Sequence, residues 1–198
     1  MRLFLLFISL VAFPALSAWQ LDNDKSSLSF ISIKNGNVAE VHHFNQLSGT
    51  FDESGKVSFS IDLLSVDTNV VARDERMRKF LFNTDVFPKA NFDAQVDMEK
   101  FNSIAVGSAD MIELTGDISL HGRVHTAVVK VVIAKLSKES FVVSSLKPIL
   151  LYANNFALEE GVNKLKELAK LPSISNAVPV SFIVSFNKET ATKEAKLK

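Results

Sequence analysis

The residues best suited to metal or acid–base chemistry are the four histidines, at positions 42, 43, 121 and 125. His42 and His43 are neighbours on an expected β-strand, so their side chains point to opposite faces and cannot hold one metal ion together. His121 and His125 flank a tight turn and could approach each other, but no carboxylate stands at ligand spacing from them. We therefore predict no metal site and interpret these histidines as solvated or hydrogen-bonded.

Nucleophilic and phosphate-binding chemistry has no signature in the sequence. The chain has no Cys, its serines fall mostly on polar strand faces, and neither a Gly-x-Ser-x-Gly elbow nor a Gly-rich phosphate loop occurs. The charged cluster 73–76 could bind an anionic head group, but Asp and Glu are stabilised by the dipole at the start of a helix, which favours a plain helix start. We predict that the protein is not an enzyme and uses no catalytic residue and no cofactor.

The composition narrows the class of ligand. The chain has 22 Lys and Arg against 22 Asp and Glu, a formal net charge of zero, whereas nucleic-acid binding would need a surplus of basic residues. It also has 16 Phe, beside one Trp and one Tyr. A Phe ring has no polar handle, so these rings must be buried or must line an apolar space. The balanced charge therefore predicts no nucleic-acid partner, whereas the Phe content fits either a packed core or an apolar cavity.

The N-terminus has the three parts of a secretory signal peptide. Met1 and Arg2 form a short positive start, residues 3–13 form an apolar run, and Ala15 and Ser17 are small residues at a cleavage site. The run is too short to span a bilayer as a helix, which needs about 20 residues. We expect residues 1–17 to be removed on export to the periplasm, with cleavage after Ser17 or Ala18. We further expect one domain over residues 18–190 and a disordered, charged tail over 191–198.

Apolar and polar residues alternate along several segments, a pattern typical of antiparallel strands with one dry and one wet face. The clearest cases are 56–63, 91–99, 114–121 and 178–186, and less regular strands fit residues 28–33, 41–51, 124–136 and 141–151. Turn residues at 52–55 and 121–123 separate apolar runs, as hairpin connections do. The segment 131–133 is apolar on both faces, so we expect its outer face to be covered.

Two segments have a helical pattern instead. Residues 73–82 are dense in charge and place Met77, Phe80 and Leu81 at helical spacing. Residues 158–171 form an amphipathic helix followed by Pro172, and packing over the sheet is favoured over lying on a membrane because the apolar stripe is narrow and the charges are mixed. The pattern thus predicts an all-β fold of about eight antiparallel strands, with a short helix after the fourth strand region and an amphipathic helix before the last strand. A closed barrel leaves no exposed edge, and a β-sandwich is the competing arrangement.

A set of motifs resembles the YceI-like family of periplasmic, lipocalin-like polyisoprenoid-binding proteins. The central pieces are Ser65-Val66-Asp67-Thr68, then Arg73-Asp74, then Phe87-Pro88-Lys89-Ala90-Asn91-Phe92. The opening strand from Trp19 to Phe30, the segment Leu47–Phe51 and the hairpin Leu114–Gly122 also match, in order and at the family's spacing. Two features depart from it: Lys34-Asn35-Gly36 stands where many members carry His, and the helix at 158–171 is longer than the usual connection.

The resemblance implies an extended, lipocalin-like barrel that encloses a long isoprenoid or fatty chain, such as a quinone tail or a polyprenyl chain. It also implies a homodimer, and we separately expect a transient contact with a membrane. The dry faces of the strands then supply the expected ligand-binding residues, which are Phe30, Phe51, Phe59, Ile61, Phe92, Val96, Ile118, Leu120, Phe141, Phe182, Val184 and Phe186. Lys34 and Arg73 are candidates for contact with a head group.

Core packing and ligand contact need the same side chains, so the sequence leaves a second function open. In that alternative the barrel is filled by its own side chains and serves a structural or interaction role, related to stress, without a ligand. An enzyme with a quinone as redox cofactor is a third option, which no motif supports.

Overall fold

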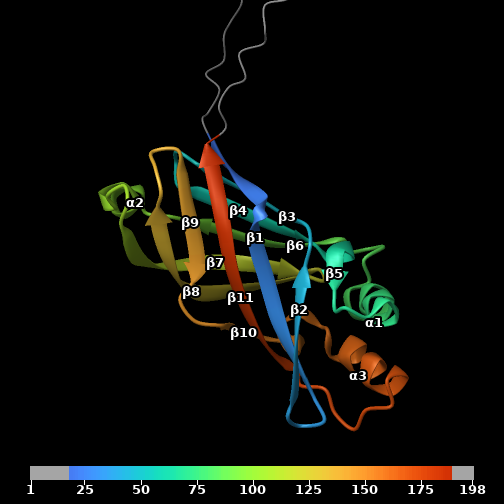
Figure 1. Ribbon diagram of the computed structural model, residues 1–198. Coiled ribbons are helices and arrows are strands. Elements are labelled where there is room, and N and C mark those ends of the chain that lie inside the picture. The colour runs from blue at the N-terminus through green and yellow to red at the C-terminus, as the bar shows by residue number, and fades with distance from the viewer. Residues whose placement is uncertain (1–17, 189–198) are drawn as a thin grey trace, which may run out of the picture.

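A computed structural model describes residues 18–188 of the chain. The expected signal peptide at 1–17 and the expected tail at 191–198 lie outside the described residues. Eight antiparallel strands close into a barrel, in the order β1-β3-β4-β6-β7-β8-β9-β11 around the ring, and β11 pairs with β1 to complete it (Figure 1). These strands are β1 (Ala18–Lys34), β3 (Leu47–Asp52), β4 (Lys56–Asp62), β6 (Lys89–Gln95), β7 (Ala109–Leu120), β8 (Arg123–Lys135), β9 (Ser140–Ser145) and β11 (Ala177–Lys188).

Three further strands extend the sheet beyond the ring. β2 (Val38–Phe44) pairs with the second half of β1, β5 (Val66–Asp67) pairs with β2, and β10 (Ile149–Tyr152) pairs with the first half of β11. β1 can pair with both β3 and β2 on one side because it is long, and its register on β11 shifts between Asp22 and Ser27. The predicted all-β, antiparallel barrel is therefore confirmed, with these strands added to it.

Short helices lie at the ends of the barrel. α2 (Met98–Ser103) lies at one end, whereas α1 (Val71–Arg76) and α3 (Glu159–Leu168) lie together at the other (Figure 1). α1 continues directly into the π-helix η2 (Met77–Phe82), and the short 3₁₀ segments η1 (Leu63–Ser65) and η3 (Ala153–Phe156) follow β4 and β10. The predicted short helix over 73–82 and the predicted amphipathic helix before the last strand are both present.

Local chemistry explains the tight turns. His121 and Gly122 both have positive φ, at 51° and 71°, as the two-residue turn between antiparallel strands requires. In the turn after β3, one carboxylate oxygen of Asp52 accepts hydrogen bonds from the backbone N–H groups of Ser54 and Lys56. Both turns lie where the sequence predicts hairpins.

The structure corrects several predicted boundaries. The single strand expected at 41–51 is two strands, because pairing with β1 is interrupted at Asn45 and Gln46: β2 pairs with the second half of β1 and β3 with its first half, on the same side. The strand expected at 141–151 breaks before Pro148, and residues 96–99 lead into α2 instead of extending β6. The helix expected at 158–171 ends at Leu168, before Lys170, which has a positive φ of 52°.

The prediction that the outer face of β8 is covered is wrong. Val124 and Val128 on that face are 64% and 62% exposed, and Val132 is only half-buried. The described helices pack at the ends of the barrel, so the middle of this wall is a single layer of sheet. Burial is concentrated on the inner face, where Val129, Val131 and Ile133 are buried.

Candidate functional site

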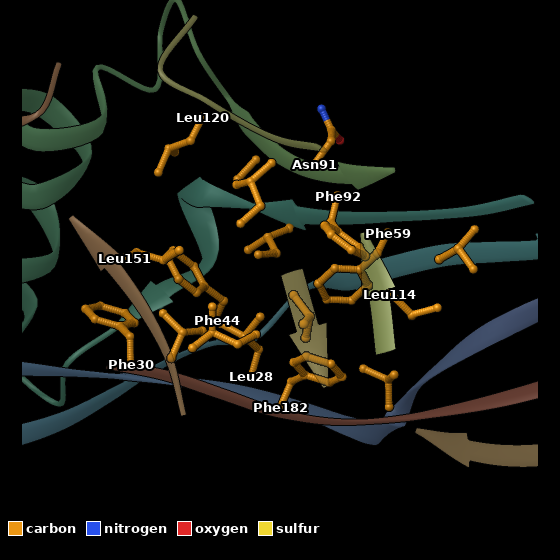
Figure 2. Close-up of a pocket in the computed structure, with 18 of the residues that line it drawn as sticks. Leu28, Phe30, Phe44, Phe59, Asn91, Phe92, Leu114, Leu120, Leu151 and Phe182 are labelled. Atoms are coloured by element: carbon orange, nitrogen blue, oxygen red, sulfur yellow. The ribbon is translucent and has the colours of Figure 1, made fainter. Parts of the chain in front are cut away.

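The inside of the barrel contains an elongated apolar hollow with a volume of about 250 Å³. Nearly all the side chains that line it are hydrocarbon, and the polar groups among them come from Asn91 and Tyr152. In Figure 2 the Asn91 amide points away from the ring-lined space. The space therefore has the character of a hydrocarbon-binding cavity and not of a catalytic pocket.

The hollow is lined by all twelve residues that the sequence predicts to bind the ligand. These residues are Phe30, Phe51, Phe59, Ile61, Phe92, Val96, Ile118, Leu120, Phe141, Phe182, Val184 and Phe186. Strand alternation places eleven of them there, since every second residue of a strand faces inward, and Val96 directly follows β6. Phe59 on β4 and Phe92 on β6 are cross-strand neighbours, and Phe182 projects into the hollow from β11 on the opposite wall (Figure 2). Whether they contact a ligand stays a prediction.

Partial exposure of inward-facing rings shows that the middle of the barrel is not filled. Phe59, Phe92 and Phe182 are half-buried although they project into the barrel, whereas Phe51 and Phe141 further along are 2% and 4% exposed. An inward ring can have accessible surface only where no neighbouring atom covers it. The interior is consequently packed around Phe51 and Phe141 and unfilled beside Phe59, Phe92 and Phe182.

Segments outside the regular strands complete the lining at the end of the barrel that carries α1 and α3. Leu81 and Phe82 come from η2, Phe156 from η3, and Leu158 and Val162 from the start of α3. Sequence reasoning missed them because it assigned the lining to strands alone. The signal was present, since the apolar stripes of both helical segments had to face something apolar.

An ion-pair network at the same end fastens α1 to the sheet. Glu40 on β2 accepts from Arg73 Nη1 and Lys34 Nζ, each at 2.8 Å, and Arg73 Nη2 donates to the Thr68 carbonyl at 2.6 Å. The hydrogen bond from Lys34, with the charge of Arg73 nearby, lowers the pKa of Glu40. Lys34 and Arg73, the candidates for head-group contact, are thus held by Glu40 and are not part of the lining.

The Arg73-Asp74 motif also closes the connection before α1. The buried carboxylate of Asp74 accepts hydrogen bonds from the backbone N–H of Thr68 and from its hydroxyl. Arg78 reaches the Val66 carbonyl at 3.1 Å. These contacts support the plain structural interpretation of the charged cluster.

The four histidines take part in separate contacts. His42 is buried and its Nε2 lies 2.8 Å from the Ser32 hydroxyl, while His43 faces outward on the same strand, near Asp67. Burial lowers the pKa of His42, and Arg73 lowers it further. His121 and His125 each lie against η3, at the Phe156 carbonyl and the Asn155 side chain respectively.

Residues 18–188 contain no group of three or more His, Cys, Asp or Glu side chains placed to hold a metal ion. No helix among the same residues combines the length and the apolar character needed to cross a membrane.

Comparison with known proteins assigns the chain to a family. The model of the YceI-like domain matches residues 19–186, which is nearly the whole described chain. The chain belongs to the YceI-like domain family. The motifs at 65–74 and 87–92 that resemble this family therefore identify it correctly.

Solved structures agree with this YceI-like assignment. A polyisoprenoid binding domain from Saccharophagus degradans, implicated in plant cell wall breakdown, shares 32% identity over 88% of this chain and 100% of its own, with a TM-score of 0.85. BcnA from Burkholderia cenocepacia shares 20% identity over 83% of this chain and 98% of its own, with a TM-score of 0.64. The Campylobacter jejuni YceI protein shares 16% over 75% of this chain and 84% of its own, with a TM-score of 0.54. No curated protein matches the chain.

Proposed function

We propose that the protein binds an isoprenoid or another long aliphatic lipid, such as a quinone tail or a polyprenyl chain, inside the barrel. The observation that carries the proposal is the continuous apolar lining of an unfilled interior. An engineered apolar cavity of about 150 Å³ already binds benzene, and this hollow is larger. Each buried methylene group contributes about 0.8 kcal/mol, so an aliphatic chain needs no precise polar contact in order to bind.

The cost of an empty interior supports the same proposal. Apolar volume that stays unfilled deprives its lining side chains of packing contacts and so destabilises the fold. A ligand that fills the hollow offsets this cost. The alternative function, a filled barrel without a ligand, expects no such space.

The family and the N-terminal pattern support the cellular setting that we propose. A structural relative is described as a polyisoprenoid binding domain, and the YceI-like family is a binding family. We propose that this protein acts in the periplasm after export, in transport, storage or sequestration of the lipid. A transient contact with a membrane during lipid exchange and a homodimer are further parts of the proposal.

Co-purification tests the proposal directly. Native mass spectrometry of gently purified protein, followed by organic extraction, should find lipid near one molecule per chain. Protein that is repeatedly empty, and that also fails to take up added polyprenyl lipid, would contradict the proposed function.

Phe182→Asp should abolish lipid uptake, because it places a carboxylate inside the apolar hollow. The matched control is Ile183→Asp on the next residue of β11, which is 49% exposed and faces outward. Ile118→Trp is a second variant, which fills the hollow with apolar atoms and should also block uptake. Circular dichroism must show that each protein is folded, and unchanged uptake by folded Phe182→Asp and Ile118→Trp would rule out this binding site.

A further inference from the structure

The hollow ends at a layer of packed aromatic rings. Phe51, Phe101, Phe141 and Phe186 come from β3, α2, β9 and β11, and all four line the hollow and are between 2% and 4% exposed. Their ring centroids lie 4.9 Å apart for Phe51 and Phe101, 5.2 Å for Phe101 and Phe141, and 5.1 Å for the stacked pair Phe141 and Phe186. We call these four residues the aromatic floor.

A second layer supports the floor from outside the hollow. Trp19 does not line the hollow but lies behind the floor, with its ring 5.3 Å from Phe51, 6.1 Å from Phe101 and 6.0 Å from Phe141. The ammonium groups of Lys135 and Lys188 lie over the rings of Phe101 and Trp19, at 4.2 and 4.8 Å. A cation over each of these two rings adds electrostatic attraction to the packing at this end.

The opposite part of the lining is built differently. At the end that carries α1 and α3, the lining residues Leu81, Leu120 and Leu151 are only half-buried, so the hollow approaches solvent there. The nearby cluster of Ala153, Phe156, Leu158 and Val162 shares no residue with the cluster that contains the floor. The hollow therefore has one end closed by interlocked rings and one end that reaches solvent.

We propose that the aromatic floor sets the greatest length of lipid tail that the hollow can bury, and that the tail enters with its apolar end toward Phe141. This inference rests on the proposed function and deepens it, because it names chain length as the property that is selected. A tail shorter than the hollow leaves space unfilled, and a longer tail leaves carbons in water at the open end. Affinity should rise with each added isoprene unit until the tip meets the floor, and then stop rising.

The chain contains its own reporter for this contact. Trp19 is the only tryptophan in the sequence, and it lies directly behind the floor. A tail that presses on Phe51, Phe101 or Phe141 should change the emission of Trp19, whereas a shorter tail should bind without changing it. Thermal stabilisation reports binding of either kind.

The test is a titration of the protein with a series of isoprenols that lengthens from farnesol by one unit at a time. Phe141→Leu and Phe51→Leu should each increase the tail length at which the affinity stops rising. They should raise the affinity ratio of the longer to the shorter isoprenol by about tenfold, the gain expected when about two more methylene groups leave water. Phe87→Leu is the control, since Phe87 packs against His121 and does not line the hollow. It should leave the ratio unchanged.

Two results would overturn the inference while leaving lipid binding intact. One is an affinity that keeps rising to the longest isoprenol in the unmodified protein. The other is the same affinity ratio in the folded floor variants and in the control. If no isoprenol stabilises the protein against heat, the result contradicts the proposed function and therefore also the role of the floor.

Discussion

Gly116, in the hairpin motif that marks the family, lies against the ring of Phe92 in the wall of the hollow. A Cβ atom built on Gly116 would stand 2.5 Å from two ring carbons of Phe92 and 2.7 Å from the Asp93 carbonyl oxygen. Real Cβ atoms do not approach other atoms so closely. The missing side chain at 116 therefore sets how far the Phe92 ring can lie from the centre of the hollow.

We predict that Gly116→Ala pushes Phe92 inward, lowers the free energy of unfolding by about 1–3 kcal/mol through overpacking, and reduces lipid capacity. Chemical denaturation and extraction of bound lipid measure the two effects. Thr115→Ala, at the exposed neighbouring position, should change neither by much. Equal stability of Gly116→Ala and the unmodified protein would show that the ring has room to move aside.

Glu40 connects β1, β2 and α1 through a single carboxylate. Lys34 and Arg73 both lie 2.8 Å from its Oε2 atom, and they hold the pKa of Glu40 below its ordinary value of 4.5. A carboxyl with a lowered pKa in the folded state stabilises the protein above its unfolded pKa, and this stabilisation is lost as the pH falls toward the folded value.

Glu40→Gln should therefore reduce stability at neutral pH and flatten the loss of stability as the pH falls below about 4.5. The measurement is the free energy of unfolding as a function of pH for both proteins, compared as a difference so that other carboxylates cancel. Glu99→Gln on exposed α2 is the control. Parallel pH profiles for Glu40→Gln and the unmodified protein would contradict this role.

Among the elements, α3 and η2 both contribute to the lining, and a glycine allows them to pack closely. A Cβ atom on Gly161 would stand 2.7 Å from the Phe80 carbonyl oxygen and 2.9 Å from Leu81 Cα, both backbone atoms that cannot turn aside. Val162, next to it, is buried and lines the hollow. The close approach at Gly161 thus positions one wall of the site.

Gly161→Ala should lift α3 from η2, lower the free energy of unfolding by about 1–3 kcal/mol, and speed release of bound lipid. Alanine is otherwise the better helix former, so helix propensity alone predicts the opposite sign. Glu160→Ala at the exposed preceding residue serves as the control. Thermal unfolding and the rate of lipid transfer to vesicles distinguish the two outcomes.

For the whole molecule, the closed ring of eight strands encloses unfilled apolar volume, and stability should depend on what fills it. A ligand at about 100 times its Kd stabilises the folded state by about 2.7 kcal/mol. In a domain of this size that amounts to roughly 5–10 °C in Tm.

Delipidated protein should therefore melt roughly 5–10 °C below protein reloaded with a fitting isoprenoid. Differential scanning calorimetry before and after organic extraction measures the difference. The Phe182→Asp variant treated in the same way should show no gain on reloading. A Tm that is indifferent to lipid in the unmodified protein would show that the hollow is not a binding site.

Much of the site follows from strand alternation in the sequence. Phe59 and Phe92 could be assigned to an inner face because their neighbours on the same strands are polar, and the hairpin at His121-Gly122 could be placed because both residues tolerate positive φ. Phe82, Phe156 and Val162 could not be assigned in this way. Their inward direction depends on how helical segments dock on the barrel, which no local pattern specifies.

The sequence by itself determined which side chains are apolar on one face, where the chain turns, and which family the motifs belong to, because these properties depend on residues close together in the chain. Only the tertiary structure decided how much of the barrel interior stays empty. Rings from β3, α2, β9 and β11 pack together at one end, while Phe59, Phe92 and Phe182 stay half-buried in the middle. Filled core and open hollow use the same side chains, so the difference lies in distances between strands that are remote in sequence.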